Sequence, residues 1–198
     1  MCLLINYKPS LLAKVQNKLR IIGGQWRSRQ IHFNDTKHLR PTPARVRETL
    51  FNWLHHDIVA SRCLDCYAGS GALSFEAASR GAAQVVLIDN NPDICRTLKA
   101  NADVLKASQI KIINMEVLRY LSGNSEPYDL VFLDPPFGQG LAQPTCQWLE
   151  DKLWLRAQAK IYVETERQLE LTTLPKNWAL IKSKSAGEVA YRLYQRQE

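Results

Sequence analysis

The sequence predicts an α/β protein of the doubly wound, Rossmann-like type, with a mostly parallel sheet covered by helices on both faces. Two observations support this fold class. From residue 61 onward, five short apolar strand patterns alternate with helical patterns, which is typical of strand–helix–strand units. After residue 177 the pattern changes to two strands around Gly187, which predicts a C-terminal antiparallel hairpin. A chain of 198 residues with 45% hydrophobic residues can bury a core of its own.

The N-terminal part precedes this alternation. Residues 1–19 are expected to form an arm, either frayed or a short amphipathic helix. Residues 20–34 predict two short strands around a Gly-Gly turn. Thr42 as N-cap and Pro43 at the first helical position then predict a helix. Its buried face is expected to carry Val46, Leu50, Trp53 and Leu54.

The elements of the main body follow from apolar runs and their punctuation. Strands are predicted at residues 62–67, 84–89, 109–114, 128–134, 159–164, 178–183 and 189–195. Helices are predicted at residues 72–80, 92–106, 116–121 and 143–152.

Positive charge is concentrated at the N-terminus. The chain carries a net charge of +7, and residues 1–50 hold ten Lys and Arg against two acids. A basic front end on a nearly neutral body suggests a polyanionic partner, although a solvated basic surface remains an alternative. The first residues have too short an apolar run for a signal peptide, and no segment reaches the length of a membrane span. We therefore expect a soluble protein.

The cysteines indicate a reducing compartment, the cytoplasm, because five thiols cannot all pair. Cys63 and Cys66 form the only close pair. They are interpreted as small apolar residues packed on either side of a strand, with half a zinc site or a redox motif as alternatives. No metal site is predicted.

The first strand of the main body runs into the turn Ala68-Gly69-Ser70-Gly71. Ligands of open parallel sheets bind beyond the carboxyl ends of the strands, and glycines let them approach closely. Asp89 ends the second strand, where an acid can hold ribose hydroxyls. The turn and Asp89 together indicate an adenosine-type cofactor. A dinucleotide-binding motif would have glycine at position 74, which is Ser74 here.

Asp65 and Glu116 narrow the choice of cofactor. Asp65 lies inside the first strand, where a carboxylate is costly to bury without a cation or hydrogen-bond donors. The ammonium of S-adenosylmethionine (SAM) would supply that cation, and backbone amides of the turn are the alternative. Glu116, with Val117 beside it, can accept from an adenine amino group; an exposed acid at a helix start is the alternative.

Asp134-Pro135-Pro136-Phe137 follows the strand predicted at 128–134 and suits methylation of an exocyclic amine. Such amines are poor nucleophiles, so an acceptor must hold the nitrogen with its lone pair facing the methyl donor. Asp134 supplies a carboxylate, and Pro136 fixes the direction of the Pro135 carbonyl. Phe137 can stack on a flipped-out base. A proline-rich turn that merely closes a strand is the structural alternative.

Four segments together resemble one family, the bacterial 16S ribosomal RNA guanine-N2 methyltransferases of the small subunit, or RsmD family. They are residues 20–27, 39–54, 64–73 and 133–137. The resemblance implies a SAM-dependent fold with a seven-stranded sheet, and methyl transfer to one guanine of 16S rRNA in assembled or nearly assembled small subunits. It implies cofactor roles for Asp65, Gly69, Gly71 and Asp89 and a catalytic role for residues 134–137. Ser28 and Ser74 depart from the glycines common in the family, and Ser74 is expected to change little.

The resemblance also divides the chain and assigns its RNA-facing part. Residues 1–19 would be an arm, residues 20–55 a basic RNA-facing extension and residues 56–198 the SAM-binding catalytic domain. Basic and aromatic side chains of the extension offer phosphate contacts and stacking. The expected RNA contacts are Arg20, Trp26, Arg27, Arg29, Arg40, Arg45 and Arg47, with His38 between them. A monomer is expected.

Three other functions fit parts of the pattern. An adenine-N6 DNA methyltransferase also uses an acid-Pro-Pro-aromatic motif, but 198 residues leave little room for a target-recognition domain. A non-catalytic RNA-binding ribosome-assembly factor on the same fold would not need the intact Asp134. A nicotinamide-dependent oxidoreductase is disfavoured by Ser74 and has no use for residues 134–137.

Overall fold

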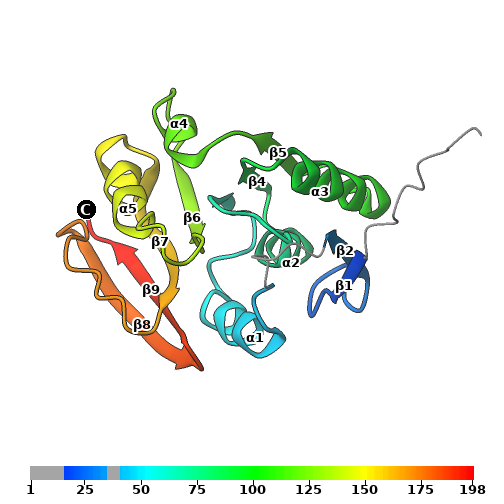
Figure 1. Cartoon of the computed structure of the whole chain (residues 1–198), viewed down its shortest axis with the longest axis horizontal. Helices are drawn as coiled ribbons and strands as arrows, with labels where there is room; N and C mark the ends of the chain where they lie inside the picture. Colours follow the sequence, from blue (N-terminus) through cyan, green and yellow to red (C-terminus); the bar gives the residue numbers. More distant parts are fainter. Residues whose placement is uncertain (1–15, 35–40) are drawn as a thin grey trace, which may run out of the picture.

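The computed structural model describes residues 16–34 and 41–198 (Figure 1). The strands are β1 (Gln16–Arg20), β2 (Gln30–Asn34), β3 (Arg62–Asp65), β4 (Gln84–Asp89), β5 (Ile110–Asn114), β6 (Tyr128–Leu133), β7 (Leu155–Glu166), β8 (Trp178–Ala186) and β9 (Val189–Arg196). The helices are α1 (Ala44–Trp53), α2 (Ala72–Ser79), α3 (Pro92–Leu105), α4 (Val117–Leu121) and α5 (Ala142–Asp151). Among the described helices, none is long and apolar enough to span a membrane.

The central sheet confirms the predicted fold class. Within the described residues it has seven strands in the order β5-β4-β3-β6-β7-β9-β8. The first five of these are parallel, whereas β9 runs antiparallel to both β7 and β8. Strand order reverses at β3, which has β4 on one side and β6 on the other. This switch point is where ligands of such sheets bind.

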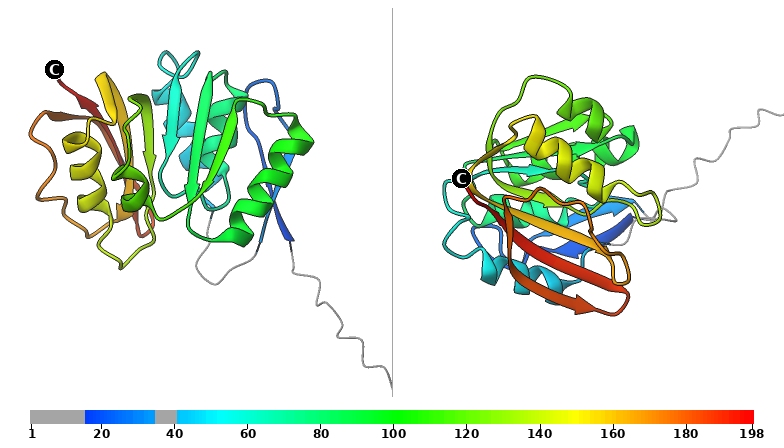
Figure 2. Two further views of the ribbon diagram at one scale, coloured as in Figure 1. Left: turned by 90° about the horizontal axis from the view of Figure 1, so that it is seen from above. Right: turned by 90° about the vertical axis from the view of Figure 1, so that its left-hand side faces the viewer.

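Helices cover both faces of the sheet, as Figure 2 shows from two further directions. Side chains of successive strand residues point to opposite faces, so each strand contributes to two cores. Val85 and Leu87 of β4 join the cluster under α1, α2 and α3, while Val86 and Ile88 join the cluster under α4 and α5. Cys63 and Cys66 likewise fall into opposite clusters, which confirms their packing role.

The N-terminal hairpin packs onto the main body of the protein. β1 pairs with β2 from Gln16 to Arg20, so the expectation that residues 16–19 belong to a separate arm is wrong. Ile21, Trp26 and Ile31 lie in the same hydrophobic cluster as α2 and α3. The extension therefore shares a core with the body. The expectations for residues 1–15, and for His38 and Arg40, fall outside the described residues.

The start of α1 differs from the prediction. Pro43 occupies the N-cap position with φ −56° and ψ 148°, and no side chain caps the helix. Thr42 is therefore not the N-cap, and Pro43 is not the first helical residue. Because proline has no N–H to offer, it is tolerated at this boundary as well. Of the predicted face, Val46, Leu50 and Leu54 are buried and Trp53 is only partly buried. Arg47 and Phe51, which were not predicted to be buried, are buried as well.

Candidate active site

Four carboxylates stand at the carboxyl edge of four adjacent parallel strands. Asp89 ends β4, Asp65 ends β3, Asp134 follows β6 and Glu164 lies near the end of β7. The strand register places Asp65 opposite Phe132, and Leu133 opposite Val163. By the alternation of side chains, the acids belong to the face covered by α1, α2 and α3. The edge of the sheet thus gathers acidic groups at its switch point.

The glycine turn between β3 and α2 is tied to the end of β4. Gly69 and Gly71 have φ values of 49° and 76°, a region that favours glycine. A Cβ on Gly71 would lie 2.7 Å from side-chain carbons of Leu98 and Phe75. The Asp89 carboxylate accepts from the backbone N–H of Gly69 at 3.0 Å and of Asn91 at 2.8 Å. Burial raises the pKa of Asp89, and these two hydrogen bonds oppose the rise.

Asp65 is enclosed, with 2% of its surface exposed. Its carboxylate accepts from the Ser74 hydroxyl on α2 at 2.5 Å. Burial raises the pKa of Asp65 to about 7, while Ser74 and the backbone N–H of Tyr67 oppose the rise. The expectation that Ser74 changes little is therefore wrong, because its fully buried hydroxyl is a direct partner of Asp65. Because the pKa of this carboxyl group is near 7, a cation bound beside it would stabilise its ionised form, so Asp65 suits a site that receives a cation.

Glu116 acts as the N-cap of α4. Its two carboxylate oxygens accept from the backbone N–H groups of Leu118 at 3.0 Å and Arg119 at 2.8 Å. This geometry matches the helix-start alternative. Val117 beside it is buried. Contacts of either residue with an adenine stay a prediction.

Asp134 differs from the other acids in having no partner. Its carboxylate accepts no hydrogen bond from the residues that the structure describes. Burial raises its pKa well above the usual value, and the charges of Glu164 and Asp65 raise it further. Asp134 is partly exposed and thus offers acceptor atoms that an incoming N–H donor can reach.

The residues after Asp134 form a short loop with an aromatic tip. Pro135 is buried, whereas Pro136 is exposed and 46% of the Phe137 side-chain surface is open to solvent. The backbone N–H of Gly138 donates to Glu166, the last residue of β7, at 2.5 Å. The loop is therefore held to the neighbouring strand, with Phe137 available for stacking. A surface groove of about 540 Å³ begins beyond it, between the start of α5 and the segment after β7.

Glu164 is a site residue that the sequence reasoning missed. It lies in β7 with 4% of its surface exposed and accepts from the Tyr162 hydroxyl at 2.7 Å. An acid directly after the apolar run 161–163 carries the signal that singled out Asp65, because burying it needs donors. The predicted strand ended at residue 164, and its last residue was assigned no chemistry.

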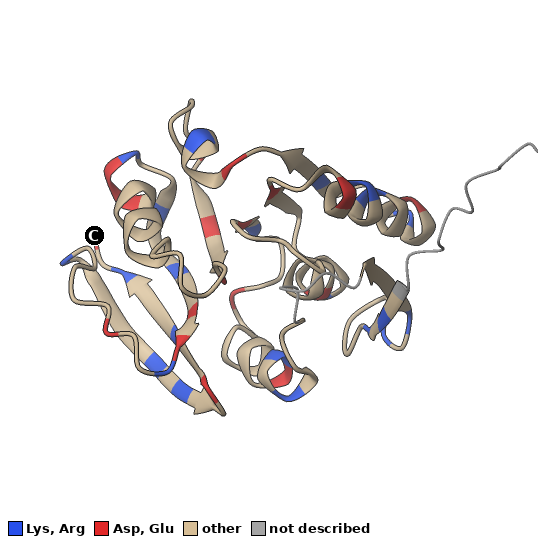
Figure 3. Ribbon diagram, in the orientation of Figure 1, with Lys and Arg blue, Asp and Glu red and all other residues tan. Residues whose placement is uncertain are grey.

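Two of the expected RNA contacts are inside the protein. Trp26 and Arg47 are only 7% and 3% exposed, so the expectation that they form an open binding surface is wrong. The indole packs into the core, and Arg47 pairs with a buried acid on α2. Arg20, Arg27, Arg29 and Arg45 are exposed. Figure 3 marks the positions of charged residues along the ribbon, among them positions on the hairpin, on α1 and on β8.

Arg29 lies away from Asp134. The Arg29 guanidinium donates to the Val104 carbonyl near the end of α3, which is the sheet edge opposite the four acids. Nearer to the acids is the β8–β9 turn, because Val189 pairs with Glu166. Lys182 and Lys184 are exposed along β8, on the strand leading into that turn. The sequence did not single out these two lysines, because residues 51–198 have a net charge close to zero.

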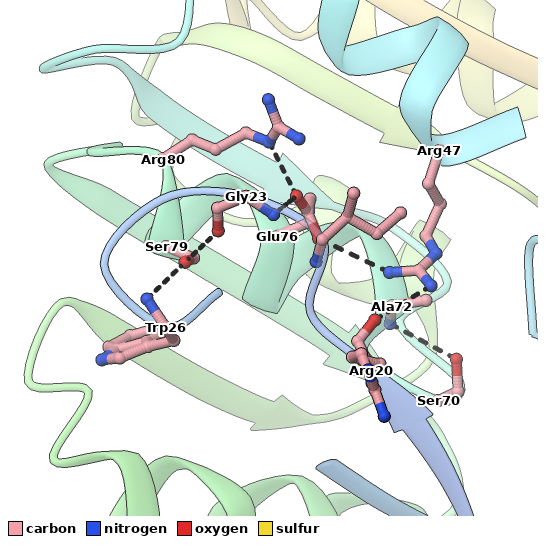
Figure 4. Close-up of polar contacts among 10 residues, drawn as sticks. Arg20, Gly23, Trp26, Arg47, Ser70, Ala72, Glu76, Ser79 and Arg80 are labelled. Carbon is pink, nitrogen blue, oxygen red and sulfur yellow. Dashed lines mark hydrogen bonds and ion pairs between the residues drawn. The ribbon is translucent and has the colours of Figure 1, made fainter. Parts of the chain in front are cut away.

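Glu76 of α2 fastens the N-terminal extension to the body, as Figure 4 shows. Its carboxylate is completely buried and accepts from the backbone N–H groups of Ile22 and Gly23, each at 2.8 Å. It also pairs with Arg80 at 2.7 Å and with Arg47 at 3.5 Å. Arg47 in turn donates to the Arg20 carbonyl at 3.1 Å. One acid thus joins β1, α1 and α2.

Ser79 adds a second attachment one turn further along α2. Its hydroxyl accepts from the Trp26 N–H at 2.9 Å and donates to the Gly23 carbonyl at 2.6 Å. Gly24 has φ +75°, and a Cβ there would lie 1.8 Å from the Ser79 carbonyl oxygen. The Gly-Gly turn recognised in the sequence is therefore required by close contact with α2.

In residues 16–34 and 41–198, no cluster of three or more His, Cys, Asp or Glu side chains is arranged to hold a metal. Burial raises the pKa of the Cys63 thiol to about 12, which leaves it a neutral packing residue.

Comparison with known proteins gives a consistent result. Residues 19–195 match the family described as Conserved hypothetical protein 95. Ribosomal RNA small subunit methyltransferase D of Escherichia coli K12 is 49% identical over 180 residues, covering 91% of each chain. The Haemophilus influenzae protein of that name is 46% identical over 184 residues, covering 91% of this chain and 95% of its own.

Solved structures agree with the fold. A chain from Escherichia coli has a TM-score of 0.83 and 48% identity, covering 91% of this chain and 99% of its own. An RNA methyltransferase from Salinibacter ruber, solved with S-adenosyl-L-homocysteine, has a TM-score of 0.63 and 16% identity, covering 80% of this chain and 95% of its own. The second likeness concerns the fold alone.

Proposed function

The chain belongs to the family described as Conserved hypothetical protein 95, together with the ribosomal RNA small subunit methyltransferases D, and from that premise we propose its reaction. It transfers a methyl group from SAM to the exocyclic N2 amine of a specific guanine in 16S rRNA. The observation that carries this proposal is the partly exposed carboxylate of Asp134, which has no partner among the described residues, three residues before the exposed ring of Phe137.

The roles of the motif residues follow from their positions. Asp134 accepts an N–H of the guanine amine and holds the nitrogen toward the methyl donor. Phe137 stacks on the flipped-out base, and the contact between Gly138 and Glu166 keeps that ring at the mouth of the site. The Pro135 carbonyl offers a second acceptor. Catalysis then consists mainly of positioning.

The residues at the switch point fit SAM, which supplies an activated methyl group on a sulfonium. Asp65 receives the ammonium of the methionine portion, since a buried carboxyl with a pKa near 7 gains from a nearby cation. Asp89, fixed by the Gly69 N–H, holds the ribose hydroxyls. Ala68, Gly69 and Gly71 let the cofactor lie against the backbone, and Glu116 and Val117 lie at the adenine end.

The RNA is proposed to contact both ends of the molecule. Arg20, Arg27, Arg29 and Arg45 offer exposed cations on the extension, and Lys182 and Lys184 offer them beside the active-site edge. Residues 20–55 are accordingly an RNA-facing extension, and residues 56–198 the catalytic domain. The proposed substrate is 16S rRNA in assembled or nearly assembled small subunits. We propose that the enzyme is a monomer and acts in the cytoplasm.

Methyl transfer from labelled SAM tests the proposal. Unmodified small subunits, naked 16S rRNA and duplex DNA are each incubated with the protein, and the products are digested to nucleosides. We expect label in N2-methylguanosine from small subunits. Label in N6-methyladenine from DNA would instead establish the adenine-specific alternative. SAM binding without label on any substrate would favour the non-catalytic assembly factor.

A matched pair of variants assigns the role of Asp134. Asp134→Asn and Asp134→Ala should abolish transfer while leaving the Kd for SAM nearly unchanged. Asp103→Asn, which alters an exposed acid on the outer helix α3, should retain wild-type transfer. Loss of SAM binding in the Asp134 variants would move this carboxylate into the cofactor site.

A further inference from the structure

Glu164 is a second acid at the catalytic edge, beside the motif that carries Asp134. β6 and β7 are hydrogen-bonded neighbours, and Leu133 lies opposite Val163. Asp134 and Glu164 therefore follow this pair at the same level of two adjacent strands, and the spacing of neighbouring strands puts their backbones about 5 Å apart across the sheet. The two acids also interact electrostatically, since the charge of Glu164 raises the pKa of Asp134.

The Glu164 carboxylate is held in one orientation, and only one of its two oxygens accepts a hydrogen bond from the described residues. The Tyr162 hydroxyl donates to Oε2 at 2.7 Å. The Tyr162 ring packs against Tyr191 with centroids 6.4 Å apart, and Tyr191 packs against Trp53 at 5.5 Å. Oε1 accepts no hydrogen bond within the described part of the chain. The Glu164 carboxylate is thus fixed beside aromatic rings and has one oxygen that can accept a hydrogen bond from a ligand.

The chemistry of the purines says which donor fits. On its Watson–Crick edge guanine presents two adjacent donors, N1–H and the N2 amine. Adenine presents an acceptor at N1 beside its amine. Two carboxylates side by side complement the two donors of guanine and repel the N1 lone pair of adenine. Recognition of this kind separates bases strongly, because the wrong base leaves a buried acceptor without a partner.

We propose that Glu164 accepts the N1–H of the target guanine while Asp134 accepts from its N2 amine, so that Glu164 determines the preference for guanine. This assignment rests on the proposed guanine-N2 reaction and names the group that reads the base. Burial raises the pKa of Glu164 before the base binds. The N–H donors of guanine then stabilise the ionised carboxylate.

2-Aminopurine separates the two roles, because it keeps the N2 amine of guanine but has a lone pair instead of a hydrogen at N1. Small subunits are reconstituted with 16S rRNA carrying either guanosine or 2-aminopurine ribonucleoside at the modified position, once that position has been mapped. The ratio of kcat/KM values for the two substrates is measured. The wild-type protein should prefer guanosine by roughly 10- to 100-fold, the range expected for one well-placed base contact.

Glu164→Gln is the informative variant. Its amide can donate to the N1 lone pair, so the preference should fall below about 10-fold or reverse, while the Kd for SAM stays within about 3-fold of wild type. Tyr162→Phe keeps the carboxylate and should retain the preference at a lower kcat. If Glu164→Gln fails to fold, the wild-type ratio for guanosine and 2-aminopurine still tests the assignment. A purely structural role of Glu164 would leave the ratio of Glu164→Gln at the wild-type value.

The outcomes separate this assignment from the reaction on which it rests. A wild-type protein that produces no N2-methylguanosine refutes the proposed reaction and the role of Glu164 with it. N2-methylguanosine with equal use of guanosine and 2-aminopurine refutes the role of Glu164 alone. A wild-type preference for 2-aminopurine would mean that Glu164 donates a proton instead of accepting one, which also overturns the assignment.

Discussion

Replacing Glu76 by alanine should destabilise the protein more than any surface substitution. The carboxylate is fully buried between two guanidinium groups and two backbone N–H groups. Its removal leaves Arg47 charged and 3% exposed, with a buried Nε that already has no partner among the described residues. Arg80 is partly exposed and can turn to water. The loss therefore falls mainly on Arg47 and on the two N–H groups.

The size of the effect follows from these contacts. Breaking a buried ion pair by removing one partner costs about 3–5 kcal/mol. The N–H groups of Ile22 and Gly23 are only partly buried, and water that enters the vacated space can satisfy them in part. We therefore expect a loss of about 4 kcal/mol. Since domains of ordinary size have about 5–15 kcal/mol of stability, this is a large fraction of the total.

Urea unfolding of the ligand-free protein measures the loss. Glu76→Gln, which keeps the shape and one acceptor, should fall between wild type and alanine. Glu48→Ala removes an exposed acid from the neighbouring helix α1 and should change stability by less than about 0.5 kcal/mol. Arg47→Met in the Glu76→Ala background should restore part of the stability by removing the uncompensated charge. A loss below about 1 kcal/mol in Glu76→Ala, or no recovery in the double variant, would refute the reasoning.

Three further predictions follow from single features. Ser28 has φ 69°, so Ser28→Gly should raise the free energy of unfolding by roughly 0.5 kcal/mol, the relief of left-handed strain less the added chain entropy; an unchanged urea midpoint would contradict the strain. The folded-state pKa of Asp65 is about 7 against an ordinary 3.8, so the folded state binds the extra proton and stability falls as pH rises from about 4 to 7, by up to about 4 kcal/mol. Asp65→Asn should remove that share of the fall between pH 5 and pH 8, and an equal fall in wild type and variant would count against it. Arg27→Ala with Arg29→Ala should weaken binding to small subunits and lower its salt dependence by about one unit of slope per lost phosphate contact; an identical slope would exclude both residues from the interface.

The sequence predicted most of the sheet because its signals are local. β4 runs from Gln84 to Asp89, the range predicted from one apolar run with polar neighbours. β1 was missed over residues 16–19 because its residues are mostly polar and become a strand only by pairing with β2. The N-cap of α1 was misplaced because both Thr42 and Pro43 favour a helix start, and the choice between them depends on packing.

The sequence predicted those residues of the candidate site that can be recognised from their own position beside a strand. Asp65, Asp89 and Asp134 each end or follow a recognisable strand, and the structure brings them to one edge. Arg47 and Trp26 look like RNA contacts in the sequence, but their burial depends on Glu76 and Ser79, which are far away in the chain. No periodicity within α1 or the hairpin could indicate those partners.

The position of β9 has a consequence for how the protein comes into being. β9 is the last strand of the chain, yet it lies between β7 and β8 in the sheet. It supplies Tyr191, which packs against Trp53 of α1 and against Tyr162 beside Glu164. A growing polypeptide that lacks these final residues has neither the partner strand of β7 nor the aromatic wall of the site. The catalytic edge is therefore completed only after residues 189–196 have been added, and loss of β9 would leave β7 and β8 each with an unpaired edge prone to aggregation.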